Sequence, residues 1–341
     1  MQISNMQKEI NEIPEALERL IEKTEPDIVD AANEIRAINP GLVTTVARGS
    51  SDHASLYLKY AIECFAGIPV ASLGPSVTSI YKKQLSLPRS VNIAISQSGQ
   101  SPDIVETASM AKKGGAFNIA ITNNVSSPLV KECKYVFNIN AGEEKSVAAT
   151  KTFVTSIFAG LLLLAHWKQD AELLRSLKGF PLLANRALEC DWSPLLVHCE
   201  KLSSLYVLGR GPAMAIALEA ALKFKETCQI HAEAFSSAEV MHGPKSIIGD
   251  DFTVLALAAR DVSEKSIIDV ANQLSTQGAK IYATTDQKIK AEKLPFTASG
   301  YSLTDPLLLI ISYYKFVEQL ARIKGLNPDN PPNLKKVTET V

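Results

Sequence analysis

Short apolar runs alternate with segments of helical periodicity along most of the chain. The run at residues 91–95 ends in a serine-rich turn, and Pro102 then opens a segment whose apolar positions repeat at helical spacing. Strands that alternate with helices predict parallel sheets covered by helices on both faces. The strands expected on this basis are residues 42–47, 69–73, 91–95, 117–122, 135–138, 205–208, 252–258 and 280–284.

Residues 6–37 are predicted to be helical, with Pro14 and Pro26 at helix starts. The segment at 157–167 is apolar but only about half as long as a membrane span, so we expect a buried core helix there. The helices expected between the strands are residues 54–61, 102–113, 150–167, 213–227, 263–277 and 306–323.

One turn occurs twice. Ala47-Arg48-Gly49 follows the first predicted strand, and Gly209-Arg210-Gly211 follows the strand at 205–208, which we interpret as the tandem duplication of one α/β unit. The domains expected are an N-terminal helical segment at 1–40, a first α/β domain at 41–170, a helical linker at 171–200, a second α/β domain at 201–326 and a C-terminal tail at 327–341. Its prolines exclude a helix from residues 327–333 of the tail.

The serine-rich turn is the clearest candidate binding element. Ser96-Gln97-Ser98-Gly99-Gln100-Ser101 joins a predicted strand to a predicted helix N-terminus. Backbone N–H groups, the helix dipole and serine hydroxyls there favour an anion such as phosphate, although Ser101 before Pro102 is also an ordinary helix cap. Gly49-Ser50-Ser51 is a second candidate wall, because ligands of open parallel sheets bind at the carboxyl ends of the strands.

Composition narrows the classes of partner. The chain has 341 residues, 46% of them hydrophobic, which is enough for two domains. The formal net charge of −1 gives no reason to expect nucleic acid or an anionic membrane as a partner. The five cysteines form no CxxC pair and are expected to be reduced and mostly buried. With no apolar signal region at the start, a cytoplasmic location is expected.

Three charged residues share one face of the predicted helix at 213–227: Glu219, Lys223 and Glu226. Such a stripe is commonly a solvated set of ion pairs. The other faces carry Ala, Leu and Phe, so the helix is expected to be buried, and a cavity lined by these charges is an equal alternative.

Two further residues are candidates for proton transfer or binding. His242 precedes Gly-Pro in a loop and suits acid–base work near neutral pH, although simple exposure is the commoner state of such a histidine. Lys336 ends a proline-stiffened tail, where lysines are usually solvated. No metal site is expected, because no HExxH spacing occurs among the nearby residues His231, Glu233 and Glu239.

Six motifs in register resemble the SIS (sugar isomerase) domain family. Their order and spacing are similar to the isomerase half of the glutamine-dependent fructose-6-phosphate amidotransferases, over nearly the whole chain. The motifs are Ala47-Arg48-Gly49-Ser50-Ser51, Ser96–Ser101, Ala141–Glu144 with Val147–Lys151, Ala217-Leu218-Glu219 through Lys225-Glu226, Ile230–Ala234 and His242-Gly243-Pro244.

The resemblance implies two tandem SIS domains, each a parallel sheet flanked by helices in a flavodoxin-like three-layer sandwich. It implies that the substrate phosphate is held by Ser51, Ser96, Gln97, Ser98 and Ser101. It implies that the sugar is bordered by Gly49, Ser50, Glu144, Val147 and Ala149.

The resemblance also implies the catalytic roles. Glu226 would move a proton between C1 and C2, and Lys223 would support it electrostatically. His242 would assist ring opening, from the neighbouring subunit of a homodimer, and Lys336 would engage the carbonyl end of the open-chain sugar. No cofactor and no metal are implied.

The sequence departs from the amidotransferase pattern at several motif positions. Ser101 replaces Thr and keeps the hydroxyl, whereas Ala149 replaces Ser and Lys335 replaces Ala, which alters the expected sugar contacts. Arg48 stands in place of Cys and Met241 in place of Lys.

No glutaminase domain is expected in this chain, so we expect a glucosamine-6-phosphate deaminase that releases fructose 6-phosphate and ammonia. The alternatives are a fructosamine-6-phosphate deglycase or other phosphosugar isomerase, and a non-catalytic sugar-phosphate sensor.

Overall fold

The structure is a computed structural model that describes residues 3–336. The chain forms two compact units, each with one parallel sheet. The N-terminal unit comprises Glu12–Glu144, Lys151–Lys178 and, of the described residues, Lys335 and Lys336. The C-terminal unit comprises, of the described residues, 3–11, Lys145–Thr150 and Gly179–Leu334.

The sheet of the N-terminal unit has the strand order β2-β1-β3-β4-β5, and all its pairs are parallel. The order reverses between β1 and β3, where Val46 is paired with Ala94. Ligands of such sheets bind at this switch point. The strands are β1 (Leu42–Val46), β2 (Val70–Ser72), β3 (Ser90–Ile95), β4 (Phe117–Thr122) and β5 (Tyr135–Asn138).

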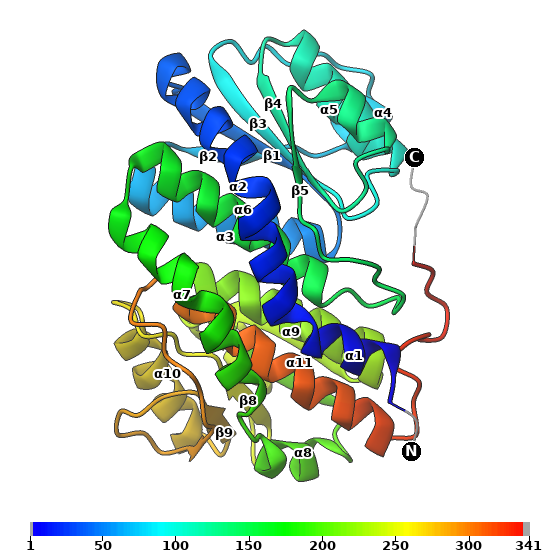
Figure 1. Ribbon diagram of the computed structural model, residues 1–341. Coiled ribbons are helices and arrows are strands. Elements are labelled where there is room, and N and C mark those ends of the chain that lie inside the picture. The colour runs from blue at the N-terminus through cyan, green and yellow to red at the C-terminus, as the bar shows by residue number, and fades with distance from the viewer. Residues whose placement is uncertain (1–2, 337–341) are drawn as a thin grey trace. The chain divides into compact units, whose positions relative to one another are not determined.

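Helices cover both faces of this sheet (Figure 1). On one face lie α2 (Ile13–Ile38), α3 (Ser50–Ala66) and α6 (Lys151–Lys168); on the other lie α4 (Ser76–Ser79), α5 (Pro102–Lys113) and the 3₁₀ turn η1 (Pro128–Glu132). The expected core helix is confirmed, because α6 packs against both α2 and α3 and is buried along nearly its whole length. Helix α7 (Ala171–Leu188) begins in this unit and ends in the C-terminal unit.

The sheet of the C-terminal unit repeats the same topology. Its order is β10-β9-β8-β6-β7. As in the N-terminal sheet, the first strand (β6) lies between the second (β7) and the third (β8), and the fourth (β9) and fifth (β10) follow. The tandem repeat predicted from the recurring turn is therefore confirmed. The strands are β6 (Ser204–Gly209), β7 (His231–Ser236), β8 (Thr253–Ala256), β9 (Lys280–Ala283) and β10 (Glu292–Lys293).

Helix α9 (Pro212–Cys228) packs on β6 and β7 and against α11 (Asp305–Ile323), which in turn contacts α1 (Asn5–Asn11) and α8 (Ser193–Cys199). Helix α10 (Glu264–Thr276) packs on β8 and β9. Two 3₁₀ turns, η2 (Glu239–His242) and η3 (Pro244–Ile247), follow β7.

Two sequence-based boundaries are wrong. Pro26 lies inside α2 and not at a helix start. The buried face of α2 against α6 stabilises the continuous helix despite the lost hydrogen bond. No strand was expected at residues 231–236, which form the edge strand β7, paired with β6 alone.

The expectation of mostly buried cysteines is only partly correct. Cys199 and Cys228 are buried, whereas Cys133 and Cys190 are half-buried and Cys64 is exposed. Burial raises the pKa of Cys133, Cys199 and Cys228 to about 12. Among the described residues, no helix is both long and apolar enough to cross a membrane.

Candidate active site

The serine-rich turn lies at the switch point of the N-terminal sheet, between β3 and α5. Ser96 Oγ accepts a hydrogen bond from Gly99 N at 3.1 Å, and Ser98 Oγ accepts one from Gln100 N at 3.3 Å. Ser101 is the residue that precedes α5, but its side chain makes no capping hydrogen bond. Ordinary side-chain capping is therefore not what this serine does.

Gly99 gives the turn its shape. Its φ of +61° lies in the left-handed region, and a Cβ there would lie 2.1 Å from Ser127 Oγ. Both the backbone angle and the close approach require glycine. The turn therefore folds tightly enough to bring Ser96, Ser98 and Ser101 to one edge of the sheet.

The turn after β1 lies beside the serine turn, because β1 and β3 are neighbours. Ser50 and Ser51 begin α3 and are half-buried. Arg48 joins the two turns: its Nε and Nη2 lie 3.0 and 2.9 Å from Asp103 Oδ2 in the first turn of α5. The Asp103 side chain is fully buried, whereas Arg48 is half-exposed. The structure thus brings both predicted phosphate-binding turns together.

Glu144 and Lys336 form an ion pair in the N-terminal unit. Lys336 Nζ lies 3.1 Å from Glu144 Oε2, which also accepts a hydrogen bond of 2.6 Å from Thr152 Oγ1. The Glu144 side chain is fully buried, and Lys336 is 25% exposed. Lys336 is consequently not a freely solvated terminal lysine.

The charged face of α9 forms a buried ionic cluster in the C-terminal unit. Lys223 Nζ lies 3.0 Å from Glu219 Oε1 and 2.7 Å from Glu226 Oε2. Lys223 and Glu219 are fully buried, and Tyr314 Oη donates a hydrogen bond of 3.1 Å to Glu219. Only Glu226 reaches the surface, with 21% of its side chain exposed. A fully solvated stripe is therefore excluded.

Lys223 keeps its positive charge in this cluster. Burial by itself lowers the pKa of Lys223, but the nearby Glu219 and Glu226 outweigh that effect and raise the pKa above its usual value. Glu219 and Glu226 share this single cation, and Glu226 is the carboxylate of the cluster that is partly exposed.

The C-terminal unit contains three further predicted site residues, His242, Val147 and Ala149. His242 ends η2 and is exposed, and within residues 3–336 it forms no hydrogen bond or ion pair with Glu226. Val147 and Ala149 are half-buried in the segment Lys145–Thr150. No group of three or more His, Cys, Asp or Glu side chains in the described part of the chain could hold a metal ion.

Residues 40–166 and 197–291 match the model of the SIS domain. The chain belongs to the SIS domain family. The first match contains all five strands of the N-terminal sheet, and the second contains β6 to β9 of the C-terminal sheet.

This SIS protein is similar to an aminotransferase, to a candidate isomerase and, in fold, to a deaminase. The glutamine–fructose-6-phosphate aminotransferase (isomerizing) of Sulfolobus acidocaldarius is 30% identical over 353 residues, which are 97% of this chain and 56% of that protein. A candidate phosphosugar isomerase from Silicibacter pomeroyi is 48% identical, with a TM-score of 0.93 over 96% of this chain and all of that one.

The glucosamine-6-phosphate deaminase of Thermotoga maritima has a TM-score of 0.78 over 99% of this chain and all of that one. At 19% identity, this likeness shows the fold alone. The SIS protein spans about half the length of the curated relatives it matches.

Several residues of the site were not foreseen from the sequence. Asp103 has the signal of an acid in the first turn of a helix, which predicts capping and not a link to Arg48. No sequence pattern marks Tyr314 or Thr152 as a site residue. Tyr314 reaches Glu219 through tertiary packing, and Thr152 reaches Glu144 across an irregular segment that periodicity does not describe.

Proposed function

We propose that this SIS protein is a glucosamine-6-phosphate deaminase, which converts glucosamine 6-phosphate and water to fructose 6-phosphate and ammonia. The observation that carries the proposal is the α9 cluster, in which Glu226 alone presents a partly exposed carboxylate beside the buried Lys223. A carboxylate held in place by an ion pair suits removal of a proton from one carbon and its return to the adjacent carbon.

The two turns at the N-terminal switch point support a phosphorylated substrate. Their hydroxyls and amides, at the N-termini of α3 and α5, are donors of the kind that bind phosphate. In the proposed complex, Ser51, Ser96 and Ser98 hold the phosphate together with Gln97 and Ser101. Gly49, Ser50, Glu144, Val147 and Ala149 border the sugar.

The proposed reaction has three steps. His242, contributed by the second subunit of a homodimer, transfers the proton that opens the sugar ring and frees the C1 aldehyde. Glu226 then removes the C2 proton and returns it to C1, while one proton of the C2 amine passes to the C1 oxygen. The aldehyde thereby becomes a hydroxymethyl group and the C2 amine becomes an imine. Water adds to C2 and ammonia leaves, which yields fructose 6-phosphate.

Lys336 engages the carbonyl end of the open-chain sugar in this proposal. It is a cation next to the buried carboxylate of Glu144, so a carbonyl or hydroxyl of the substrate competes with that ion pair. Lys223 does not touch the substrate in this proposal and stabilises the Glu226 carboxylate as a fixed positive charge.

The relatives support an amino-sugar phosphate as substrate. The Sulfolobus relative is named an isomerizing aminotransferase of fructose 6-phosphate, and the deaminase reaction joins the same kinds of ketose and amino sugar in the opposite direction.

A second candidate function is aldose–ketose isomerisation without an amine, which the likeness to the Silicibacter protein favours. Purified protein should be incubated separately with glucosamine 6-phosphate and with glucose 6-phosphate. Stoichiometric ammonia and fructose 6-phosphate from the amino sugar alone would support the deaminase. Turnover of glucose 6-phosphate without ammonia from the amino sugar would overturn it in favour of the plain isomerase.

A further inference from the structure

The segment Lys145–Thr150 alternates between buried and half-exposed side chains. Ser146, Ala148 and Thr150 are buried, whereas Val147 and Ala149 are partly exposed. The segment lies in no helix or strand. Its backbone therefore lacks the regular hydrogen bonds of a helix or strand. The contacts that anchor the buried side chains consequently also set the direction of the Val147 and Ala149 side chains.

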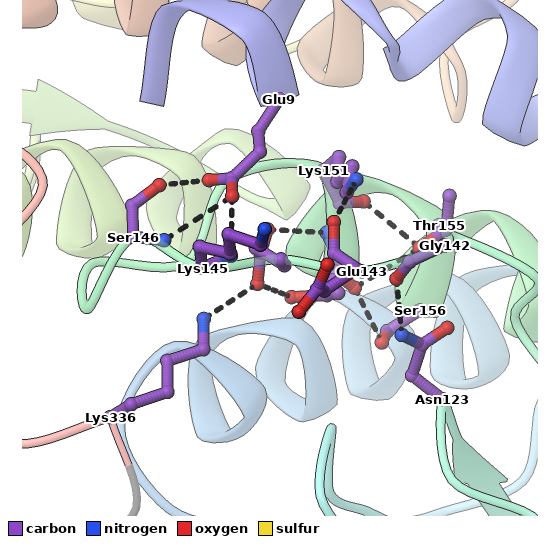
Figure 2. Close-up of polar contacts among 12 residues, drawn as sticks. Glu9, Asn123, Gly142, Glu143, Lys145, Ser146, Lys151, Thr155, Ser156 and Lys336 are labelled. Carbon is purple, nitrogen blue, oxygen red and sulfur yellow. Dashed lines mark hydrogen bonds and ion pairs between the residues drawn. The ribbon is translucent and has the colours of Figure 1, made fainter. Parts of the chain in front are cut away.

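Glu9 of α1 anchors the buried side of this segment (Figure 2). Its carboxylate accepts hydrogen bonds from Lys145 N, from Ser146 N and from the Ser146 hydroxyl. Glu9 is only 4% exposed. Burying a carboxylate is costly unless several donors satisfy it, so these three hydrogen bonds hold the segment and the glutamate together.

Asp329 ties the same segment to α1 by a second route. Its two carboxylate oxygens accept hydrogen bonds of 2.8 Å from Asn5 N and Met6 N at the start of α1. Its backbone oxygen accepts a hydrogen bond of 3.0 Å from Val147 N. Asp329 thus fixes the beginning of α1 and the backbone of Val147 at once.

We infer that Glu9 and Asp329 are positioning residues that hold Val147 and Ala149 in place as the sugar-facing wall of the active site. The inference rests on the proposed function, which assigns Val147 and Ala149 to the sugar. Neither acid needs to touch the substrate, because Glu9 acts through its hydrogen bonds with Lys145 and Ser146, and Asp329 through the backbone of Val147 and the start of α1.

Glu318 offers a matched control on α11, the helix that contacts α1. It lies on α11, is 1% exposed, and accepts hydrogen bonds of 2.6 Å from Ser4 Oγ and 2.8 Å from Arg322 Nε. Like Glu9, it is a buried carboxylate, and it contacts the N-terminal segment through Ser4. Unlike Glu9, it forms no hydrogen bond with any residue of 145–150 among the described residues.

The test compares Glu9→Ala, Glu9→Gln and Glu318→Ala by kcat/KM for glucosamine 6-phosphate, by the inhibition constant of inorganic phosphate and by melting temperature. We expect Glu9→Ala to lower kcat/KM by at least about tenfold, since displacement of a binding group by ~1 Å can cost roughly 100-fold. Glu9→Gln keeps an acceptor for both N–H groups and should restore most of the activity. Inhibition by phosphate should stay unchanged.

Equal losses of kcat/KM in Glu9→Ala and Glu318→Ala would overturn the inference, because the loss of activity would then follow from reduced stability of the protein and not from displacement of the segment. If Glu9→Ala does not fold, Ser146→Ala and Asp329→Ala decide the question. The first removes a hydroxyl that donates to Glu9, and the second removes both side-chain acceptors that tie residue 329 to the start of α1. A fall of kcat/KM in both supports positioning, and unchanged values in both overturn it. A wild-type protein that does not turn over the amino sugar refutes the proposed function instead, and calorimetric binding of the sugar phosphate to the same variants then tests the inference.

Discussion

Gly49 and Gly211 adopt the same unusual backbone conformation in the two repeats. Gly49 has φ 55° and ψ −133°, and Gly211 has φ 58° and ψ −137°. Each immediately precedes the helix that follows the first strand of its sheet, α3 or α9. This region of backbone angles is almost restricted to glycine, so the duplication preserved a conformation as well as a topology.

Alanine at either glycine should strain the turn without a clash. A Cβ at Gly49 or Gly211 would meet no atom within 4 Å, so the cost comes from the backbone angles alone. We expect each of Gly49→Ala and Gly211→Ala to destabilise the protein by about 1–3 kcal/mol in urea unfolding. Only Gly49→Ala should also weaken inhibition by inorganic phosphate, because only its turn carries Ser50 and Ser51. Equal phosphate inhibition in the two variants would argue against phosphate binding at the turn after β1.

Replacement of Glu226 by glutamine should remove the proton-transfer step and leave the fold intact. We expect kcat for ammonia release to fall by about 10²–10⁴-fold, the usual contribution of a general base. The inhibition constant of inorganic phosphate should not change. Glu233→Gln, at an exposed position of β7, is the matched control and should keep wild-type kcat. A Glu226→Gln variant with more than a tenth of the wild-type rate would refute the role of this carboxylate.

Lys223→Met should be strongly destabilising. It leaves the fully buried Glu219 without its cation, and loss of one partner of a buried ion pair costs about 3–5 kcal/mol. The double variant Glu219→Gln/Lys223→Met should recover part of this loss, because the unpaired charge is gone. Lys225→Met, on the exposed side of the same helix, should cost less than about 1 kcal/mol. Unfolding in urea measures all three, and a Lys223→Met variant as stable as Lys225→Met would contradict the prediction.

Glu25 should contribute stability that depends on pH. Burial acts to raise its pKa, but hydrogen bonds and charge from Lys178 and His166, whose Nε2 lies 2.9 Å from Glu25 Oε1, lower it below the ordinary value of 4.5. A carboxyl with a lowered folded pKa stabilises the fold above the unfolded pKa, and this contribution disappears as the pH falls through the folded pKa.

Glu25→Gln should therefore lower the free energy of unfolding at pH 7 by up to about 1 kcal/mol, and by much less at pH 3. Glu22→Gln, at an exposed position of the same helix, serves as the control and should show no such difference between the two pH values. A loss in Glu25→Gln that is as large at pH 3 as at pH 7 would mean that the ion pairs are not its cause.

Most elements of the fold could be predicted from the chain, because buried parallel strands and their helices have distinct periodicities. The strands at 117–122 and 135–138 have the predicted limits, and α5 begins at Pro102 and ends at Lys113 as expected. Pro26 and the edge strand β7 were not predictable from local pattern. In both cases the contacts of a neighbouring element decide the outcome: α6 for Pro26, and β6 for β7.

The sequence predicted the types of residue in the site better than it predicted the contacts between them. Spacing placed Glu219, Lys223 and Glu226 on one face of α9 but left open whether water or protein surrounded them. Their burial comes from packing of α9 against α11, which supplies the Tyr314 hydroxyl from a distant part of the sequence. The pairing of Lys336 with Glu144 is likewise invisible to periodicity, because it joins residues on unrelated segments.

The sequence by itself determined the strand–helix alternation, the repeated glycine turn and the serine-rich turn, because each depends on residues close together in the chain. Only the tertiary structure decided that Ser101 does not cap its helix with its side chain, that Lys223 is enclosed by two carboxylates, and that Glu9 and Asp329 hold the segment of Val147 and Ala149. The physical reason is that burial and hydrogen-bond partners of charged groups are set by neighbours that folding brings from far along the chain.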